Sequence, residues 1–250
     1  MPGSPAEQPH SSHFFSQKYN DIYFTQEDPE AEKQFVFVAA NRVAKRIAAA
    51  DTFTVAELGF GFGLNYALTV HAAKQADCLH KLRFFSVEEN FPEEAAAKAL
   101  AERLKICRNE FTPPPVPFPT DAERGNFFPF GENTFIIPLS TSWGAAASAA
   151  GPRVAEGRGG VYHGDVISFL NQATFLADAW YFDGFSPAKN PAMWSAEVFA
   201  QAFALTKTGG TFSTYSAAGW VKRNLEAAGF VTQKIPGYGA KREMLTGYRP

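Results

Sequence analysis

The sequence predicts an α/β protein, with an open, mostly parallel twisted sheet covered by helices on both faces and closed by an antiparallel hairpin. Two observations lead to this fold class. Short apolar segments that suit buried strands alternate with longer segments of helical pattern along most of the chain. A glycine-rich stretch, Gly59-Phe60-Gly61-Phe62-Gly63, directly follows the first apolar segment, where a strand is expected to turn into a helix.

The beginning of the chain has little apolar character. Residues 1–18 are rich in Ser, Pro, Gln and His and are predicted to be disordered, so that a single domain spans residues 19–250. Ordered structure is expected to begin at residues 20–24. Apolar side chains at mostly helical spacing then predict a helix over residues 31–50.

The first half of the sheet follows this helix. The pattern predicts a strand over residues 54–57, a helix over 64–74 and a second strand over 82–87. A helix is expected over residues 92–105, because proline suits its first turn. Residues 106–160 contain three consecutive prolines and an Ala/Gly-rich run, which predict an irregular insertion, either a lid over a site or an inert segment.

Regular alternation resumes after the insertion. Gly209-Gly210 is expected to close one helix and Gly229 another. The last two strands should form an antiparallel hairpin. The predicted strands lie near residues 161–163, 180–182, 211–214, 231–235 and 243–248, and the predicted helices span 166–172, 191–207 and 220–228.

The glycine stretch indicates a cofactor loop. It lacks the third glycine of the G-x-G-x-x-G dinucleotide fingerprint and the Gly-Lys-Ser/Thr of a P-loop. The remaining interpretations are a simple turn or the E/D-x-G-x-G-x-G corner of proteins that bind S-adenosyl-L-methionine. We predict the second, with cofactor contacts from Gly59, Gly61, Gly63 and Asn65. The fold is then the Rossmann-like class I methyltransferase layout, a mostly parallel seven-stranded sheet with a C-terminal antiparallel hairpin.

Acidic residues stand at the ends of four successive predicted strands, where ligands bind in open α/β sheets. Glu57 can accept from the cofactor's ammonium, directly or through water, and Glu88 from both ribose hydroxyls. Asp165 can accept from the adenine amino group, although it is also a good helix-cap candidate. Asp183 would lie where the methyl group leaves. One such acid is commonly a cap or a turn residue, but four together favour a cofactor site.

The loop that follows Asp183 indicates the chemistry. It reads Asp-Gly-Phe-Ser-Pro-Ala-Lys-Asn-Pro and leaves a buried strand, a place where loops commonly position reacting groups. A carboxylate suits an aliphatic amine substrate, because the amine is mostly protonated at neutral pH and becomes cationic again after methylation. We therefore expect Asp183 to orient the amine and stabilise the ammonium product. The alternative makes Asp183 a turn residue and Phe185 a core residue.

Composition excludes several classes of protein. The chain has 250 residues, 46% of them hydrophobic, and a formal net charge of −2, so no global basic field attracts nucleic acid. Two distant cysteines and five histidines without ligand spacing predict no metal site and a reduced compartment. No apolar run is long enough for a membrane span and no secretory signal is evident, so we expect a cytoplasmic protein.

Four segments of the chain carry a resemblance to a known family, in the order residues 21–25, 57–65, 178–194 and 237–245. At these places the chain resembles the methyltransferase part of the bifunctional bacterial tRNA (5-methylaminomethyl-2-thiouridine) methyltransferase family. This resemblance implies methyl transfer from S-adenosyl-L-methionine to an aminomethyl group on the wobble uridine in the tRNA anticodon stem-loop. It maps the cofactor acids onto Glu57, Glu88 and Asp165 and the catalytic carboxylate onto Asp183.

The resemblance has two limits. The family continues into an FAD-dependent oxidoreductase, whereas this chain stops at Pro250, so we expect that activity to be absent here. The protein is then either a stand-alone enzyme or one half of a larger chain, with the oxidoreductase as a separate or fused partner. Residues 106–160 match nothing in the family.

Substrate contacts are predicted from basic and aromatic residues near the expected site. Lys189, Lys241 and Arg242 are candidates for tRNA phosphates, and Tyr23 or Phe185 for stacking on a flipped base. Lys222 and Lys234 are more readily explained as solvated surface. Two other functions stay open at this point: a small-molecule amine N-methyltransferase on the same fold, and an RNA-binding module without enzymatic activity.

Overall fold

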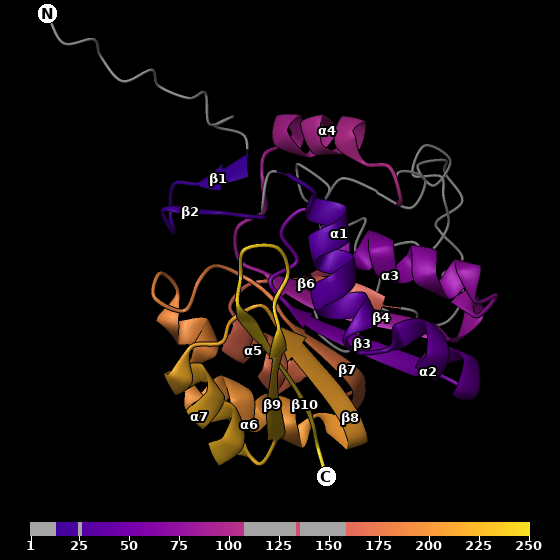
Figure 1. Cartoon of the computed structure of the whole chain (residues 1–250), viewed down its shortest axis with the longest axis vertical. Coiled ribbons are helices and arrows are strands. Elements are labelled where there is room, and N and C mark those ends of the chain that lie inside the picture. Colours follow the sequence, from indigo (N-terminus) through magenta and orange to yellow (C-terminus); the bar gives the residue numbers. More distant parts are fainter. Residues whose placement is uncertain (1–13, 25–26, 108–133, 136–158) are drawn as a thin grey trace, which may run out of the picture.

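The structure is a computed structural model that describes residues 14–24, 27–107, 134–135 and 159–250. Its centre is an eight-stranded sheet in the order β5-β6-β4-β3-β7-β8-β10-β9 (Figure 1). The strands β6, β4, β3, β7 and β8 are parallel, and β10 is antiparallel to both β8 and β9. The strands are β3 (Phe53–Leu58), β4 (Leu82–Glu88), β5 (Thr134–Phe135), β6 (Gly159–His163), β7 (Ala177–Phe182), β8 (Thr206–Thr214), β9 (Val231–Pro236) and β10 (Glu243–Tyr248).

This topology confirms the predicted mostly parallel sheet and its C-terminal antiparallel hairpin. Seven strands are those that the sequence predicts. The eighth, β5, is a two-residue strand antiparallel to β6 at one edge. It lies inside the predicted insertion, of which residues 108–133 and 136–158 are outside the described part of the chain.

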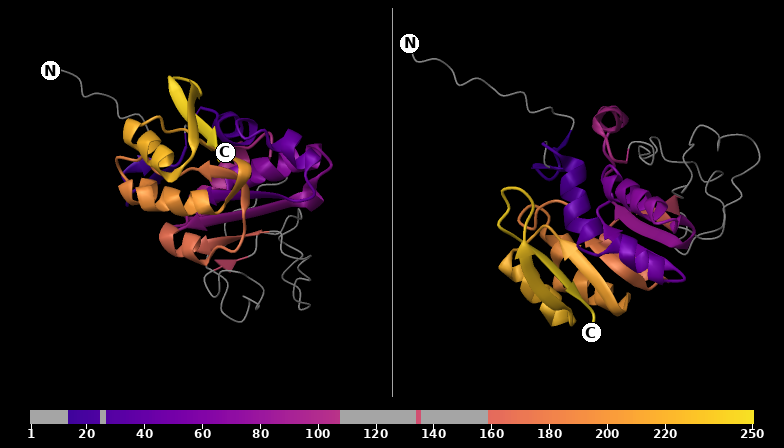
Figure 2. Two further views of the ribbon diagram at one scale, coloured as in Figure 1. Left: turned by 90° about the horizontal axis from the view of Figure 1, so that it is seen from below. Right: turned by 45° about the vertical axis from the view of Figure 1, so that its right-hand side comes forward.

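Helices cover both faces of the sheet, as Figure 2 shows, and each face has its own apolar cluster. The buried strands are apolar on both sides, which a parallel sheet between two helical layers requires. One layer contains α1 (Pro29–Lys33), the π-helical segment η2 (Gln34–Ala39), α2 (Val43–Ala49), α3 (Leu64–Gln75) and α4 (Glu94–Arg103). The other contains α5 (Val166–Gln172), α6 (Ala196–Ala204) and α7 (Gly219–Ala228).

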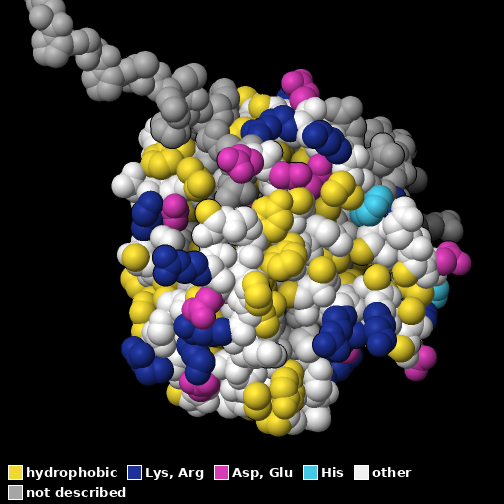
Figure 3. Space-filling model, in the orientation of Figure 1, with side chains coloured by type: hydrophobic (Ala, Val, Ile, Leu, Met, Phe, Trp, Pro, Cys, Tyr) yellow, Lys and Arg dark blue, Asp and Glu magenta, His cyan; other side chains and the backbone are white. Residues whose placement is uncertain are grey.

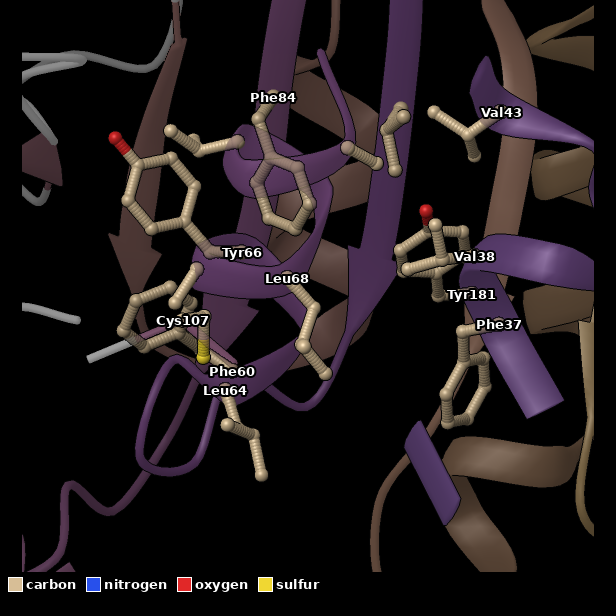
Figure 4. Packing of buried hydrophobic residues seen from close by; sticks show 14 of the residues in the cluster. Phe37, Val38, Val43, Phe60, Leu64, Tyr66, Leu68, Phe84, Cys107 and Tyr181 are labelled. Carbon is tan, nitrogen blue, oxygen red and sulfur yellow. The ribbon is translucent and has the colours of Figure 1, made fainter. Parts of the chain in front are cut away.

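The first of these layers packs large side chains directly on the sheet (Figure 4). The rings of Tyr66 on α3 and Phe84 on β4 lie 5.2 Å apart, and those of Phe37 and Tyr181 lie 5.3 Å apart. All four side chains are 3% exposed or less. Full burial of such a side chain is worth about 1.5–3 kcal/mol, so these contacts fix how α3 and η2 lie on the sheet.

The prediction of one continuous helix over residues 31–50 is wrong. The segment is divided into α1, η2 and α2, and Arg42 adopts a left-handed backbone with φ of 53° immediately before α2. Asn41 is fully buried at this break, and its side chain donates to the carbonyl of Phe37 and to Ser213 Oγ. Periodicity cannot reveal such a break, because the apolar spacing is similar on both sides of it.

The predicted helix over residues 191–207 is also wrong at its end. The segment forms a 3₁₀ turn, η6 (Pro191–Trp194), and then α6, and strand β8 already begins at Thr206. Gly209-Gly210 therefore lies within β8 and does not close a helix. A side chain at Gly210 would come within 2.6 Å of Thr206 Cγ2, so glycine serves close strand packing here. Gly229 does end α7 in a left-handed conformation, as predicted.

The N-terminal segment divides at the edge of the described region. Residues 1–13 of the segment predicted to be disordered lie outside it. Phe14 is buried, and β1 (Phe15–Ser16) pairs with β2 (Asp21–Ile22) in a small hairpin. Glu30 ties α1 to the segment after α4, because its buried carboxylate accepts from the backbone N–H groups of residues 105–107.

Candidate active site

A cavity of about 230 Å³ opens at the carboxyl ends of the central strands. The glycine loop, the ends of β4, β6 and β7, α1 and the N-terminal hairpin surround it. This is the edge at which the sequence predicts a ligand. Of the four predicted acids, Glu88, Asp165 and Asp183 line the cavity, while Glu57 lies behind it.

The glycine loop approaches the end of β7 closely. Gly59, Gly61 and Gly63 have φ values of 91°, 53° and 78°, which favour glycine. A Cβ on Gly59 would lie 2.9 Å from the backbone oxygen of Asp183. The amides of Gly59 and Phe60 both donate to the Val87 carbonyl, which fixes the loop against β4. The glycines thus allow three strand ends to meet around one cavity.

Glu57 does not reach the cavity directly. Its side chain is completely buried, one oxygen accepts from Asn65 Nδ2 at 2.7 Å, and the other accepts from Ser86 Oγ at 2.7 Å. Burial raises its pKa to about 8. In this structure Glu57 is linked to the cavity through Asn65, and its predicted contact with a cofactor ammonium, directly or through water, stays a prediction.

Asn65 connects the two acids at the ends of β3 and β7. Its Nδ2 also donates to Asp183 Oδ2 at 2.8 Å, while its buried Oδ1 has no hydrogen-bond partner among the described residues. An unpaired buried acceptor is costly, and Asn65 lines the cavity. The arrangement suits a ligand that brings a donor, such as an ammonium group.

Glu88 faces the cavity at the end of β4. One carboxylate oxygen accepts from the Gly61 amide at 2.7 Å and the other from the Asn90 amide at 2.9 Å, so its orientation is fixed. It is 8% exposed, and burial raises its pKa to about 7. The remaining lone pairs on the two oxygens can accept from a pair of vicinal hydroxyls.

Asp165 combines both interpretations that the sequence left open. It is the N-cap of α5, because its Oδ1 accepts from the Ser168 amide at 2.9 Å. Hydrogen bonds from the Ser168 hydroxyl and then from the Ser168 amide hold the pKa of Asp165 below the usual range. Asp165 also lines the cavity beside Gly164. A cap uses one oxygen, so the other can still accept from a ligand amino group.

Asp183 accepts from three groups around the cavity. Its Oδ1 accepts from the Gly184 amide at 2.9 Å, and its Oδ2 accepts from Asn65 and from the Lys33 ammonium. Asp183 and Lys33 are 6% and 8% exposed. The sequence did not predict Lys33, because its position on a short N-terminal helix carries no local signal that it reaches the end of β7.

The loop after Asp183 is held from several sides. Tyr215 donates to the Gly184 carbonyl at 2.7 Å, Trp194 Nε1 donates to the Phe185 carbonyl at 3.0 Å, and the Ser186 amide donates to Asp21 at 2.9 Å. These contacts join the loop to β8, η6 and the N-terminal hairpin. A loop fixed in this way can position a reacting carboxylate accurately.

The two predicted stacking residues lie together under the N-terminal hairpin. The rings of Tyr23 and Phe185 are 5.0 Å apart at a steep angle, and Tyr19 stacks on Phe185 at 4.5 Å. Tyr19 also donates to Glu89 at 2.7 Å. Tyr19 already covers one face of the Phe185 ring, so base stacking on either predicted residue stays a prediction. Sequence reasoning missed Tyr19, because it adjoins a segment with the composition of disorder.

The basic residues proposed for tRNA are largely engaged within the protein. Lys189 pairs with Asp21 at 3.2 Å, and Lys241 pairs with Glu32 at 2.8 Å and lies over the Tyr215 ring. Arg242 is exposed beside Lys241. The two lysines interpreted as solvated surface, Lys222 and Lys234, pair with Glu226 and Glu243. On the face in Figure 3, Lys and Arg side chains alternate with Asp and Glu.

The described residues contain no group of three or more His, Cys, Asp or Glu side chains that could hold a metal ion. Within the same residues, no helix has the length and apolar character to cross a membrane. Cys78 and Cys107 are buried and in the reduced thiol form.

Comparison with known proteins gives matches over most of the chain. Residues 155–250 match a family described as S-adenosyl-L-methionine-dependent methyltransferase. The chain is similar to proteins named tRNA 5-methylaminomethyl-2-thiouridine biosynthesis bifunctional protein MnmC. Identity is 34% over 252 residues for Aeromonas hydrophila, 36% over 245 for Nitrosospira multiformis and 37% over 240 for Pseudomonas aeruginosa. These alignments cover 93–94% of this chain but only 33–35% of the relatives' length.

A solved structure shares the fold. The crystal structure of MNMC2 from Aquifex aeolicus superimposes with a TM-score of 0.62 at 21% identity, covering 94% of this chain and 67% of that chain. At this level of identity the likeness concerns the fold alone. It agrees with the fold class that the sequence predicts.

Proposed function

We propose that this chain is an S-adenosyl-L-methionine-dependent methyltransferase that methylates the 5-aminomethyl group of the tRNA wobble uridine. It corresponds to the methyltransferase part of the bifunctional tRNA 5-methylaminomethyl-2-thiouridine biosynthesis proteins. The product is 5-methylaminomethyluridine or its 2-thio form. The observation that carries the proposal is the buried Asp183 carboxylate at the cavity, fixed by the Gly184 amide, Asn65 and Lys33.

The cavity fits the cofactor at three places. The glycine loop lets the backbone pass beside a ligand, Asn65 offers an unpartnered buried acceptor, and Glu88 presents an oriented carboxylate. We assign the methionine ammonium to Asn65, which Glu57 orients, and the ribose hydroxyls to Glu88. Asp165 would accept from the adenine amino group. When bound, the cofactor supplies an activated methyl group on sulfur.

Asp183 would act on the substrate amine. A carboxylate held by three donors keeps a defined direction, so it can accept an N–H bond and point the amine lone pair toward the methyl carbon. It also offsets the positive charge that the nitrogen gains during methylation. A hydroxyl substrate would gain less from this group, because it carries no cationic product.

The tRNA substrate is proposed from the relatives' names together with the amine chemistry of the site. Lys189, Lys241 and Arg242 would contact phosphates after exchanging their present partners, and Tyr23 or Phe185 would contact the base. A tRNA substrate implies a cytoplasmic reaction. An FAD-dependent oxidoreductase, fused or separate, would supply the aminomethyl group.

One observation favours a second candidate. The predicted basic contacts Lys189 and Lys241 already pair with acids, and charges on the visible face are mixed (Figure 3). A small-molecule amine would need no basic surface. Methyl incorporation into low-molecular-weight amines in the absence of tRNA would identify this alternative.

The test is a methyl-transfer assay. Protein is incubated with labelled cofactor and tRNA that carries 5-aminomethyl-2-thiouridine, and the nucleosides are analysed by mass spectrometry. We expect labelled 5-methylaminomethyl-2-thiouridine. Asp183→Asn should bind the cofactor with unchanged affinity by calorimetry but turn over about 100-fold more slowly. Glu226→Gln, an exposed acid on α7, is the matched control and should retain wild-type turnover. Wild-type turnover in Asp183→Asn would remove Asp183 from the reaction.

A further inference from the structure

Lys33 is a buried cation in the cavity, and the proposed reaction gives it no role. It is the last residue of α1, it is 8% exposed, and it lines the cavity. Its ammonium donates to Asp183 Oδ2 and lies 5.2 Å from the centre of the Phe37 ring. Burying a lysine removes its hydration, so a position of this kind requires compensation from its surroundings.

Both oxygens of Asp183 have a hydrogen-bond donor apart from Lys33. The Gly184 amide and Asn65 already donate to its two oxygens. The backbone immediately after Lys33 is π-helical over Gln34–Ala39, an uncommon conformation that occurs frequently at functional sites. Both observations indicate that Lys33 contributes charge to the cavity in addition to a structural contact.

The charged groups around this pair come from four elements. Glu57 lies behind Asn65 on β3, and since its pKa is raised to about 8 it is mostly protonated at neutral pH. Tyr215, which follows β8, is neutral because burial raises its pKa. Glu32 on α1 is paired with Lys241 from the β9–β10 turn. The Asp183 carboxylate and the Lys33 ammonium form an ion pair at the cavity.

From this arrangement we propose that Lys33 is a positioning residue that acts through Asp183. It lowers the net negative charge that the carboxylate presents to the substrate, so that the amine binds in the neutral, nucleophilic form while Asp183 still accepts its N–H bond. This inference rests on the proposed function. A lone carboxylate beside an aliphatic amine would stabilise the ammonium form, typically raising the amine pKa by about 1–3 units. The ammonium has no lone pair and cannot accept a methyl group.

In the proposed reaction the substrate ammonium first loses a proton to solvent. The neutral nitrogen then forms a bond to the methyl carbon of S-adenosyl-L-methionine, and the carbon–sulfur bond breaks with its electron pair retained by sulfur. The products are a neutral thioether and a secondary ammonium ion. Lys33 neither gains nor loses a proton in these steps, since its role requires only its positive charge.

The experiment compares pH profiles of single-turnover methyl transfer for the wild type, Lys33→Met and Lys33→Arg. The substrate is an anticodon stem-loop that contains 5-aminomethyl-2-thiouridine. Lys33→Met should move the acid limb upward by about 1–2 pH units, giving a deficit of about 10- to 100-fold at pH 7 that shrinks as the pH rises. Lys33→Arg, which retains the charge, should keep the wild-type profile.

Two controls make the result specific. Calorimetry with S-adenosyl-L-methionine checks that Lys33→Met folds and binds the cofactor as the wild type does. Repeating the profiles in a Glu57→Gln background keeps the titration of Glu57 from contributing to the shift. A deficit in Lys33→Met that is constant across pH, or an Lys33→Arg profile that matches Lys33→Met, would overturn the inference. An inactive wild type would instead refute the proposed function, and the inference with it.

Discussion

Replacing Gly59 with alanine tests whether the glycine loop must touch the end of β7. The new Cβ would lie 2.9 Å from the Asp183 carbonyl oxygen and 3.1 Å from Gly184 Cα, and both atoms are backbone atoms that cannot rotate away. The residue must also adopt a φ of 91°. The positive φ costs about 1–2 kcal/mol and the displaced backbone costs a similar amount, so we expect Gly59→Ala to lose about 3 kcal/mol of unfolding free energy.

Gly209→Ala is the matched control. Gly209 has a φ of 73°, but a Cβ there meets nothing within 4 Å, so it should show only the backbone cost of about 1 kcal/mol. Unfolding in urea gives the free energies, and calorimetry gives the affinity for S-adenosyl-L-methionine. We expect Gly59→Ala to bind the cofactor at least 10-fold more weakly, because the loop and Asp183 must separate. Equal stability losses and equal affinities in the two variants would refute the close approach.

Two predictions concern pH. Burial raises the pKa of Glu57 from about 4.5 in the unfolded chain to about 8 in the folded protein. The contribution of Glu57 to stability is therefore fully present below the unfolded-state pKa and is lost as the pH rises through the folded-state pKa. The free energy of unfolding should fall between about pH 5 and pH 8, and Glu57→Gln should reduce the slope by up to about 1.4 kcal/mol per pH unit; unchanged slopes in urea unfolding would contradict this. The pKa of Glu88 is raised to about 7, so cofactor affinity should increase as the pH rises through 7 and the carboxylate becomes available to the ribose hydroxyls. Glu88→Gln should bind weakly with no such pH dependence, and a wild-type pH dependence measured by calorimetry in this variant would exclude Glu88 from that role.

The sequence was informative where chemistry depends on neighbouring residues. The glycine stretch and the acid at the end of each strand predicted both the edge of the sheet and three of the cavity-lining acids, Glu88, Asp165 and Asp183. Parallel strands bring their carboxyl ends together whatever connects them, so alternation of strands and helices is sufficient for that inference. The sequence did not reveal that Asn65 stands between Glu57 and Asp183, because position at a strand end does not show which side chains a carboxylate contacts.

The extra pairings of the site depended on contacts between distant parts of the chain. Lys33 contacts Asp183, which is 150 positions away in the sequence, and Tyr19 in the turn of the N-terminal hairpin stacks on Phe185. The break at Asn41 depends on Ser213, 172 positions away, and Gly210 serves packing of β8 against β7. Patterns of neighbouring residues carry no information about such partners.

The sequence by itself therefore determined the fold class, the glycine loop and the position of Asp183 at the end of a strand, because periodicity and short motifs act within a few residues. Only the tertiary structure decided that Asp183 is paired with a buried lysine, that Glu57 is hydrogen-bonded to Asn65 and that the N-terminal hairpin lies beside the cavity. These features depend on burial and on the meeting of remote side chains, and both exist only once the sheet and its two helical layers have assembled.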